Sequence, residues 1–333
     1  MYERPSNLVF EGGGVLGIAY LGVLQYLTQN DILMNLKRVA GTSAGAITAC
    51  ITSFNLPFTE TKKIADTLDF RKVPGKDPFP DLLKLSKPAW NELEKIFGDL
   101  DCVYRLLNNY GWFSTEYFYH WIKKQIESQF DPFKKLPPYT FADFKNPYIH
   151  KENRPFFDLY VIGTDLSYRS SRIFSCETTP DMEVAEAVRI SMSIPLFFEA
   201  IELDEDYFIK DGAPNIYCDG GVMWNYPINI FDSITFEDRN APALYNQTLG
   251  ARFLSRTKYH EINNLLDYIK NLYHSQMRIQ QDIFDNSPED QARSIQIDPG
   301  DVSAIDFDIS TGDETYKFLY SQGYQAARSF FEK

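Results

Sequence analysis

The chain has 333 residues and a net charge of −13, with 44% hydrophobic and 24% charged residues, a composition typical of a globular protein. The acidic charge argues against nucleic acid as a partner and against docking that relies on a basic patch at anionic lipid. The sequence has neither the apolar core of a signal peptide nor an apolar run of the ~18–20 residues that span a membrane, so we expect a cytoplasmic protein.

The first part of the chain alternates between short apolar strands and helices. Predicted strands over 7–10 and 36–40 each lead into a turn that contains glycine, and predicted helices over 18–27 and 44–54 follow these turns. Strand, glycine turn and helix repeated in this order are typical of an α/β fold with parallel strands. We therefore expect a mostly parallel central sheet.

Residues 69–153 interrupt this alternation. The segment is rich in proline and in aromatic residues between helical stretches. This composition indicates an irregular helical insertion over one end of the sheet. We expect it to be either a lid or a structural elaboration within one domain that spans residues 1–333.

After the insertion, the alternation of strands and helices resumes. The sequence predicts strands over 157–164, 172–175, 215–218 and 294–297, and helices over 183–190, 262–284 and 314–331. In the helix over 262–284, one side carries Leu265, Leu266, Ile269, Leu272, Tyr273, Gln276 and Ile279. We expect that side to pack on the sheet.

Ser43 stands in the turn after the second predicted strand, in the run Gly41-Thr42-Ser43-Ala44-Gly45. A serine in a sharp strand-to-helix turn presents its hydroxyl to a substrate, and the helix that follows directs N–H groups at the reacting atoms. Such a serine becomes a nucleophile when a base takes its proton. The same small residues also allow close packing of a helix, so the motif alone leaves a structural role open.

The glycine turn after the first predicted strand can supply hydrogen-bond donors. The backbone N–H groups of Gly12, Gly13 and Gly14 are suited to an oxyanion hole, in which the loss of one donor typically costs ~3–4 kcal/mol. Gly12, Gly14 and Gly17 also have the spacing of a dinucleotide-binding loop. The acidic residue that completes such a site has only a weak candidate in Asp31, and a nucleotide-binding module is the rival interpretation of this loop.

A serine nucleophile also needs a base, and none of the four histidines stands in a recognisable motif. Asp219 is the candidate, because it ends a predicted strand and precedes Gly220 and Gly221. An aspartate is a weak base at its usual pKa of ~3.9, but burial raises the pKa and improves the match to serine. Asp211 begins a similar run in a polar stretch and is the less favoured alternative. Histidines and cysteines lie far apart, so we expect no metal and no cofactor.

These three elements together resemble the patatin-like phospholipases, in which a serine and an aspartate form a dyad without histidine. The segment Ala187-Val188-Arg189-Ile190-Ser191-Met192-Ser193-Ile194-Pro195 is similar to a further motif of that family, and its Arg189 and Ser191 are expected to be structural neighbours of the dyad. The resemblance covers most of the chain and is weakest over 69–153. Leu16 departs from the pattern, because many members carry Arg or Lys at that position.

The resemblance implies a lipid acyl hydrolase with a three-layer α/β/α fold. Asp219 would take the proton from Ser43, which would attack the ester carbonyl of a phospholipid or related glycerolipid. The N–H groups of Gly12, Gly13 and Gly14 would hold the oxyanion, and water would then release the fatty acid from the acyl-enzyme without a metal. The expected partner is a lipid at a membrane surface that the protein contacts transiently. An acyltransferase or thioesterase with the same dyad is the alternative.

Overall fold

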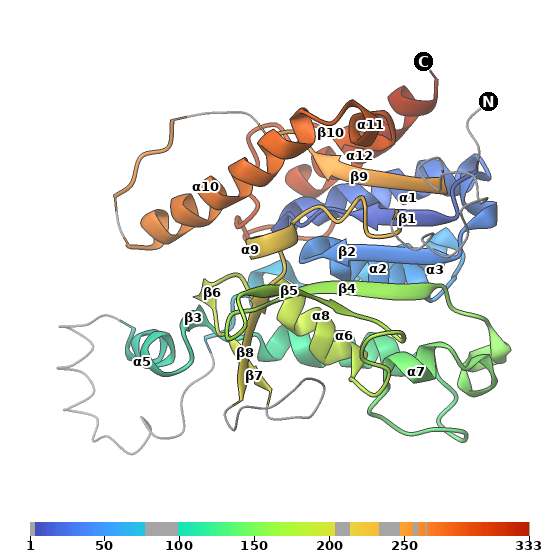
Figure 1. Cartoon of the computed structure of the whole chain (residues 1–333), viewed down its shortest axis with the longest axis horizontal. Coiled ribbons are helices and arrows are strands. Elements are labelled where there is room, and N and C mark those ends of the chain that lie inside the picture. The colour runs from blue at the N-terminus through green and yellow to red at the C-terminus, as the bar shows by residue number, and fades with distance from the viewer. Residues whose placement is uncertain are drawn as a thin grey trace.

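The computed structural model describes residues 4–76, 99–203, 214–232, 247–255, 259–263 and 265–332. In this part of the chain, a central sheet has the strand order β10-β9-β1-β2-β4-β8-β7, and β5 also pairs with β4 (Figure 1). The strands of this sheet are β1 (Asn7–Phe10), β2 (Arg38–Thr42), β4 (Asp158–Asp165), β5 (Ser170–Phe174), β7 (Ile201–Leu203), β8 (Asn215–Asp219), β9 (Thr248–Phe253) and β10 (Ser294–Ile297). Strands β3 (Gly111–Phe113) and β6 (Leu196–Phe198) form a separate parallel pair.

The central sheet is mostly parallel. Strands β10, β9, β1, β2 and β4 run in one direction. Beyond them, β5 and β8 pair with β4 in the antiparallel sense, and β7 pairs with β8 in the same way. The fold class predicted from the sequence, α/β with a mostly parallel central sheet, is therefore confirmed.

The strand register brings the motifs together. Phe10 pairs with Gly41, so the turns that follow β1 and β2 leave the sheet side by side. Thr42 pairs with Ile162 of β4, and the next residue of β4, Gly163, pairs with Asp219 at the end of β8. Three segments far apart in the sequence thus meet at one edge of the sheet.

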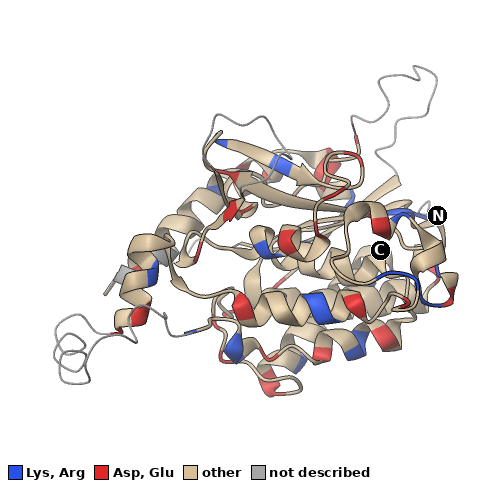
Figure 2. Cartoon of the chain, turned by 90° about the horizontal axis from the view of Figure 1, so that it is seen from below, with Lys and Arg blue, Asp and Glu red and all other residues tan. Residues whose placement is uncertain are grey.

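The helices lie mainly on one face of the sheet and at the edge where these turns meet (Figure 1). They are α1 (Ile18–Gln29), α2 (Ala44–Ser53), α3 (Phe58–Asp66), α5 (Leu100–Asn108), α6 (Glu116–Glu127), α7 (Phe141–Phe144), α8 (Val184–Met192), α9 (Gly221–Trp224), α10 (Leu265–Asp285), α11 (Pro288–Ala292) and α12 (Glu314–Phe331). Short 3-10 helices cover Gly14–Gly17, Ile32–Asn35, Phe70–Lys72, Pro147–Ile149 and Lys151–Asn153. Figure 2 shows basic and acidic residues interspersed along the helices. None of the described helices is long and apolar enough to cross a bilayer.

Alternate residues of the strands enter two separate cores. Leu8 and Phe10 of β1 join the main core, which α1, α2, α8 and α12 complete on one face of the sheet. Val9, between them, points to the opposite face and packs in a smaller core with Ile228 and Phe231. The segment after α9, rather than a further long helix, thus supplies the apolar side chains of this second core.

Most predicted elements lie where the sequence places them, with ends that differ by at most three residues. Strand β9 is an element that the sequence analysis does not predict. It lies between β1 and β10 in the sheet, directly after residues that lie outside the described part of the chain.

The packing side predicted for the helix over 262–284 is wrong in part, because Tyr273 and Gln276 face the protein as predicted but the apolar residues Leu272 and Ile279 do not. Leu272 and Ile279 of α10 are 55% and 65% exposed. The side of α10 that faces the protein carries Tyr273 and Gln280 together with buried Met277. The apolar pattern misleads because α10 contacts backbone polar groups of the turn after β8 rather than the apolar surface of the sheet.

The described part of the insertion over 69–153 contains α5, β3, α6 and α7. Residues 77–98 lie outside the described part, and the role of the insertion as a lid stays a prediction.

Candidate active site

Ser43 occupies a sharp turn between β2 and α2. Its backbone has φ 54° and ψ −123°, a conformation that costs roughly 1–3 kcal/mol in a residue other than glycine. The helix begins at this residue, because the Ser43 carbonyl accepts hydrogen bonds from the N–H groups of Ala46 and Ile47 at 2.9 and 3.1 Å. A Cβ atom on Gly45 would lie 2.4 Å from the carbonyl oxygen of Phe10, so only glycine allows α2 to approach β1 this closely. Strain of this kind is typical of a nucleophile turn.

The glycine loop after β1 lies beside Ser43, and two of its N–H groups have no partner in the described part of the chain. The N–H groups of Gly13 and Gly14 donate to no acceptor among the described residues. The Gly12 N–H, the third predicted donor, is already engaged, because it donates to the Asn225 carbonyl at 3.0 Å. Gly14 has φ +54°, and a Cβ atom there would lie 1.9 Å from the carbonyl oxygen of Ala304. The loop thus offers two fixed donors in a backbone shape that requires glycine.

Asp219 lies at the end of β8 and is fully buried. Burial raises its pKa from 3.8 to about 7, while hydrogen bonding with the Ser43 hydroxyl, the Gly221 N–H and the Tyr273 hydroxyl lowers the pKa. The Gly221 N–H donates to Oδ1 at 2.6 Å, whereas Oδ2 has no well-aligned partner in the described part of the chain. The contact between the Ser43 hydroxyl and the Asp219 carboxyl is therefore a loose one. The site holds a buried carboxylate whose pKa suits a general base near neutral pH.

The C-terminal end of α8, with Ser191 in its last turn and Ser193 directly after it, connects Ser43 with Asp219. The Ser43 N–H donates to Ser191 Oγ at 2.9 Å, and the Ser191 hydroxyl donates to the carbonyl of Ile162 in β4 at 2.5 Å. The Asp219 N–H donates to the Ser193 carbonyl at 2.8 Å. Ser191 therefore fixes the backbone of Ser43, and Ser193 fixes the backbone of Asp219.

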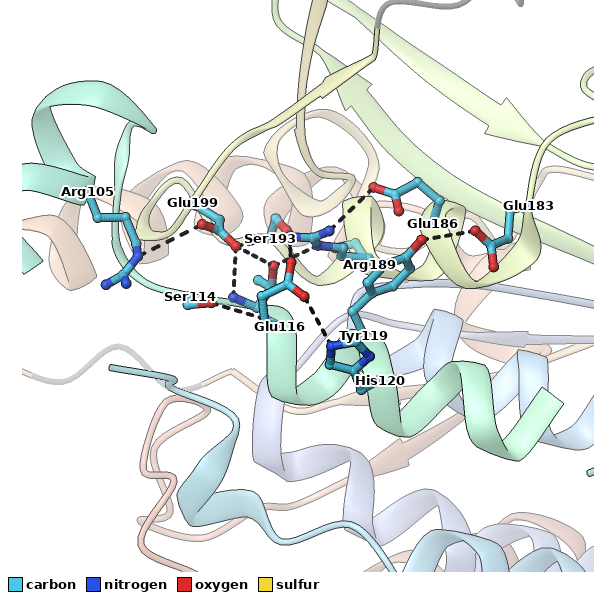
Figure 3. A network of polar contacts seen from close by, with 11 residues as sticks. Arg105, Ser114, Glu116, Tyr119, His120, Glu183, Glu186, Arg189, Ser193 and Glu199 are labelled. Atoms are coloured by element: carbon cyan, nitrogen blue, oxygen red, sulfur yellow. Dashed lines mark hydrogen bonds and ion pairs between the residues drawn. The ribbon is translucent and has the colours of Figure 1, made fainter. Parts of the chain in front are cut away.

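Arg189 ties this segment to the insertion (Figure 3). Its guanidinium donates to Thr115 Oγ1 at 2.8 Å and pairs with Glu116 and Glu199 at 2.9 and 3.0 Å. The buried Glu199 also accepts hydrogen bonds from the N–H and the hydroxyl of Thr115 at 3.0 and 2.9 Å. Arg189 lies within this network rather than beside Ser43, which supports the structural role expected for it.

Asn225, directly after α9, holds the glycine loop through hydrogen bonds. Its Nδ2 group donates to the Gly12 carbonyl at 3.3 Å and to Glu11 Oε1 at 3.4 Å. The Phe253 N–H donates to Glu11 Oε2 at 2.7 Å. Burial raises the pKa of Glu11 to about 7, although the nearby Arg252 lowers it. These contacts hold the loop against β9 and the turn after β8.

A cavity of about 760 Å³ opens beside the glycine loop. This volume lies in the range of sites that hold small organic ligands. Gly12, Gly13, Gly14, Asn225 and Tyr273 line it on the motif side, whereas Ser43 and Asp219 are buried and are not among its lining residues. Apolar side chains supply much of the remaining wall: Leu16, Ile194, Phe197, Phe253, Met277, Val302 and Ile305.

A hollow of about 1900 Å³ lies elsewhere, at the opposite ends of the parallel strands. Ser6, Lys37 and Gln247 line it, and it contains none of the motif residues. We therefore assign the candidate site to the smaller cavity. Asp211, the alternative to Asp219, lies outside the described residues.

The comparison with known families agrees with this geometry. A model of the patatin-like phospholipase family matches residues 8–232, which is more than half of the chain. The chain belongs to the patatin-like phospholipase family. The match contains the glycine loop, Ser43 and Asp219, so the family expected from the motifs is confirmed. Membership supports a lipid hydrolase activity.

Viral and bacterial proteins are similar to this chain. It is 27% identical to the uncharacterised protein R571 of Acanthamoeba polyphaga mimivirus over 325 residues, which are 95% of this chain and 91% of the relative. It is 26% identical over 229 residues to 463L of Invertebrate iridescent virus 6, named a probable lipid hydrolase, and that match covers 68% of this chain and 62% of the relative. The crystal structure of VipD from Legionella pneumophila matches 99% of this chain and 67% of VipD, with a TM-score of 0.59 and 18% identity. This likeness to VipD shows a shared fold.

Proposed function

We propose that the protein hydrolyses fatty-acyl esters of phospholipids or related glycerolipids through Ser43 and Asp219. The observation that carries the proposal is a buried carboxylate, with its pKa raised to about 7, that lies within hydrogen-bonding reach of a serine in a strained turn. Near neutral pH, a carboxyl group with this pKa is present in both its neutral and its ionised form. The neutral form is tolerated in a buried position, and the ionised form can accept the serine proton.

In the proposed reaction, Asp219 accepts the proton of the Ser43 hydroxyl while Oγ attacks the ester carbonyl. The N–H groups of Gly13 and Gly14 donate to the oxygen that becomes negative, and Gly12 keeps the loop against Asn225. The leaving alcohol takes the proton from Asp219, which leaves an acyl group on Ser43. Asp219 then takes a proton from water, the hydroxide attacks the acyl carbonyl, and the fatty acid leaves as Ser43 regains its proton.

The cavity wall and the nearby surface support a lipid substrate. Exposed apolar side chains surround the site on α5, β6, α9 and α10, namely Leu107, Leu196, Met223, Leu272 and Ile279. These elements lie at the same end of the molecule, and α10 packs against α9 and β6 (Figure 1). Exposed apolar residues around a site are typical of contact with another apolar surface. We therefore propose that this end meets a membrane transiently while a lipid enters the cavity.

A fluorophosphonate probe tests the proposal, because it reacts with an activated serine much faster than with an ordinary one. Mass spectrometry should place the adduct on Ser43, and Ser43→Ala should abolish it. Absence of labelling together with tight binding of a nucleotide would instead favour the nucleotide-binding alternative.

A panel of phospholipids and neutral glycerolipids, with Ser43→Ala as the control, would identify the substrate class. Product analysis with and without an acceptor alcohol distinguishes a hydrolase from an acyltransferase, and a thioester in the panel tests the thioesterase alternative.

A further inference from the structure

Helix α10 contacts the turn after Asp219 with glutamine side chains. Gln276 Nε2 donates to the Val222 carbonyl at 2.6 Å, and Gln280 Nε2 donates to the Gly221 carbonyl at 2.8 Å. Gln280 Oε1 accepts a hydrogen bond from the Asn225 N–H at 2.7 Å. One side of α10 therefore fixes the backbone at the start of α9 and directly after its end. Tyr273, one turn before Gln276, lies on the same side of α10.

The hydroxyl of Tyr273 lies beside the Asp219 carboxyl. A Cβ atom on Gly221 would lie 2.5 Å from Tyr273 Oη, 2.8 Å from Asn225 Oδ1 and 2.9 Å from Asp219 Oδ1, so these three oxygens surround the same small space. Burial and the Asp219 carboxylate raise the pKa of Tyr273 well above its usual value, so the hydroxyl keeps its proton and is a donor beside the carboxylate. Tyr273 is also part of the cavity wall.

This contact comes from beyond the matched family region. The family match ends at residue 232, whereas α10 begins at Leu265. Within the match, the groups that hydrogen-bond to the Asp219 carboxyl are the Gly221 N–H and the Ser43 hydroxyl.

We propose that Tyr273 is a positioning residue for Asp219, whose carboxylate accepts a hydrogen bond from the Tyr273 hydroxyl and is thereby held ionised and oriented toward Ser43. This inference rests on the proposed function, because it takes Asp219 as the base. Tyr273 keeps its own proton throughout, and the proton of Ser43 passes to Asp219. A donor to the anionic form lowers the pH at which the base becomes available.

The pH dependence of Ser43 labelling by a fluorophosphonate tests this role without requiring a known substrate. Labelling rates are measured between pH 5 and pH 9 for the wild type, Tyr273→Phe and Tyr268→Phe. Tyr268 is the matched control, because it is an exposed tyrosine of the same helix. The midpoint of the acid limb should rise by about one pH unit in Tyr273→Phe, the shift expected when a hydrogen bond to a charged group is lost, and should not move in Tyr268→Phe.

A purely structural role would lower the rate of Tyr273→Phe at every pH without moving the midpoint, and that result would overturn the inference. Loss of the fold in Tyr273→Phe, seen by circular dichroism, would also overturn it, because the hydroxyl would then serve stability rather than Asp219. If the wild type is not labelled at Ser43, the proposed function itself fails. If the wild type is labelled and the midpoint is unchanged, only the role of Tyr273 fails.

Discussion

Replacement of Asp219 by asparagine should abolish activity and, at the same time, stabilise the folded chain at neutral and alkaline pH. Asp219 is fully buried, and burial raises its pKa from 3.8 to about 7. Between these two values, the folded chain holds a proton that the unfolded chain has released. The free energy of unfolding of the wild type therefore falls as the pH rises from about 4 to about 7. The asparagine variant has no proton to lose at this position.

The size of the effect follows from the pKa. The rise from 3.8 to about 7 is about three units, and each unit corresponds to about 1.4 kcal/mol. The variant should thus gain about 4 kcal/mol in stability over the wild type between pH 4 and pH 8, as an order of magnitude. Glu11, whose pKa burial also raises to about 7, is present in both proteins, so the difference between them isolates Asp219.

Urea unfolding at pH 4, 6 and 8 measures this difference, with Asp31→Asn as the same substitution at an exposed carboxylate. The stability of Asp219→Asn relative to the wild type should increase with pH and level off above pH 7. A difference that stays constant from pH 4 to pH 8, or that favours the wild type increasingly, would refute the assignment of a buried carboxylate with a raised pKa.

Two further substitutions test the geometry around Ser43 and Asp219. Gly221→Ala would place a methyl group 2.5 Å from Tyr273 Oη and 2.9 Å from Asp219 Oδ1. We therefore expect the rate of Ser43 labelling by the fluorophosphonate to fall at least tenfold. Labelling at the wild-type rate would contradict this arrangement. Ser191→Ala leaves the buried N–H of Ser43 without its acceptor, so thermal unfolding should show a loss of about 1–3 kcal/mol, whereas unchanged stability would mean that this hydrogen bond is not formed.

The sequence predicts the fold well where glycine turns follow apolar strands. The turns after β1 and β2 are defined by local residue types, and the parallel order of these strands follows from the helices between them. Ser43 and Asp219 are found in the same way, because each stands beside glycines at the end of a strand. The structure brings the two together through the register of β4 with β2 and β8, which no local pattern contains.

The parts of the site that sequence reasoning misses depend on long-range contacts. Tyr273 has helical spacing with apolar neighbours, so its pattern indicates packing rather than contact with Asp219. The engagement of the Gly12 N–H by Asn225 joins residues that are more than 200 positions apart. The raised pKa of Asp219 depends on complete burial, which the covering segments decide together. Motif spacing could identify the candidate residues, but not the donors and acceptors around them.

Release of fatty acid by the Ser43→Ala variant tests the central claim most directly. Wild-type protein and variant are incubated with the lipid that the panel identifies, and free fatty acid is quantified by mass spectrometry after the fold of the variant has been verified. Loss of a serine nucleophile typically lowers the rate by several orders of magnitude, and we expect a fall of at least about a thousandfold. Release at the wild-type rate by the folded variant would contradict the claim that Ser43 attacks the acyl ester.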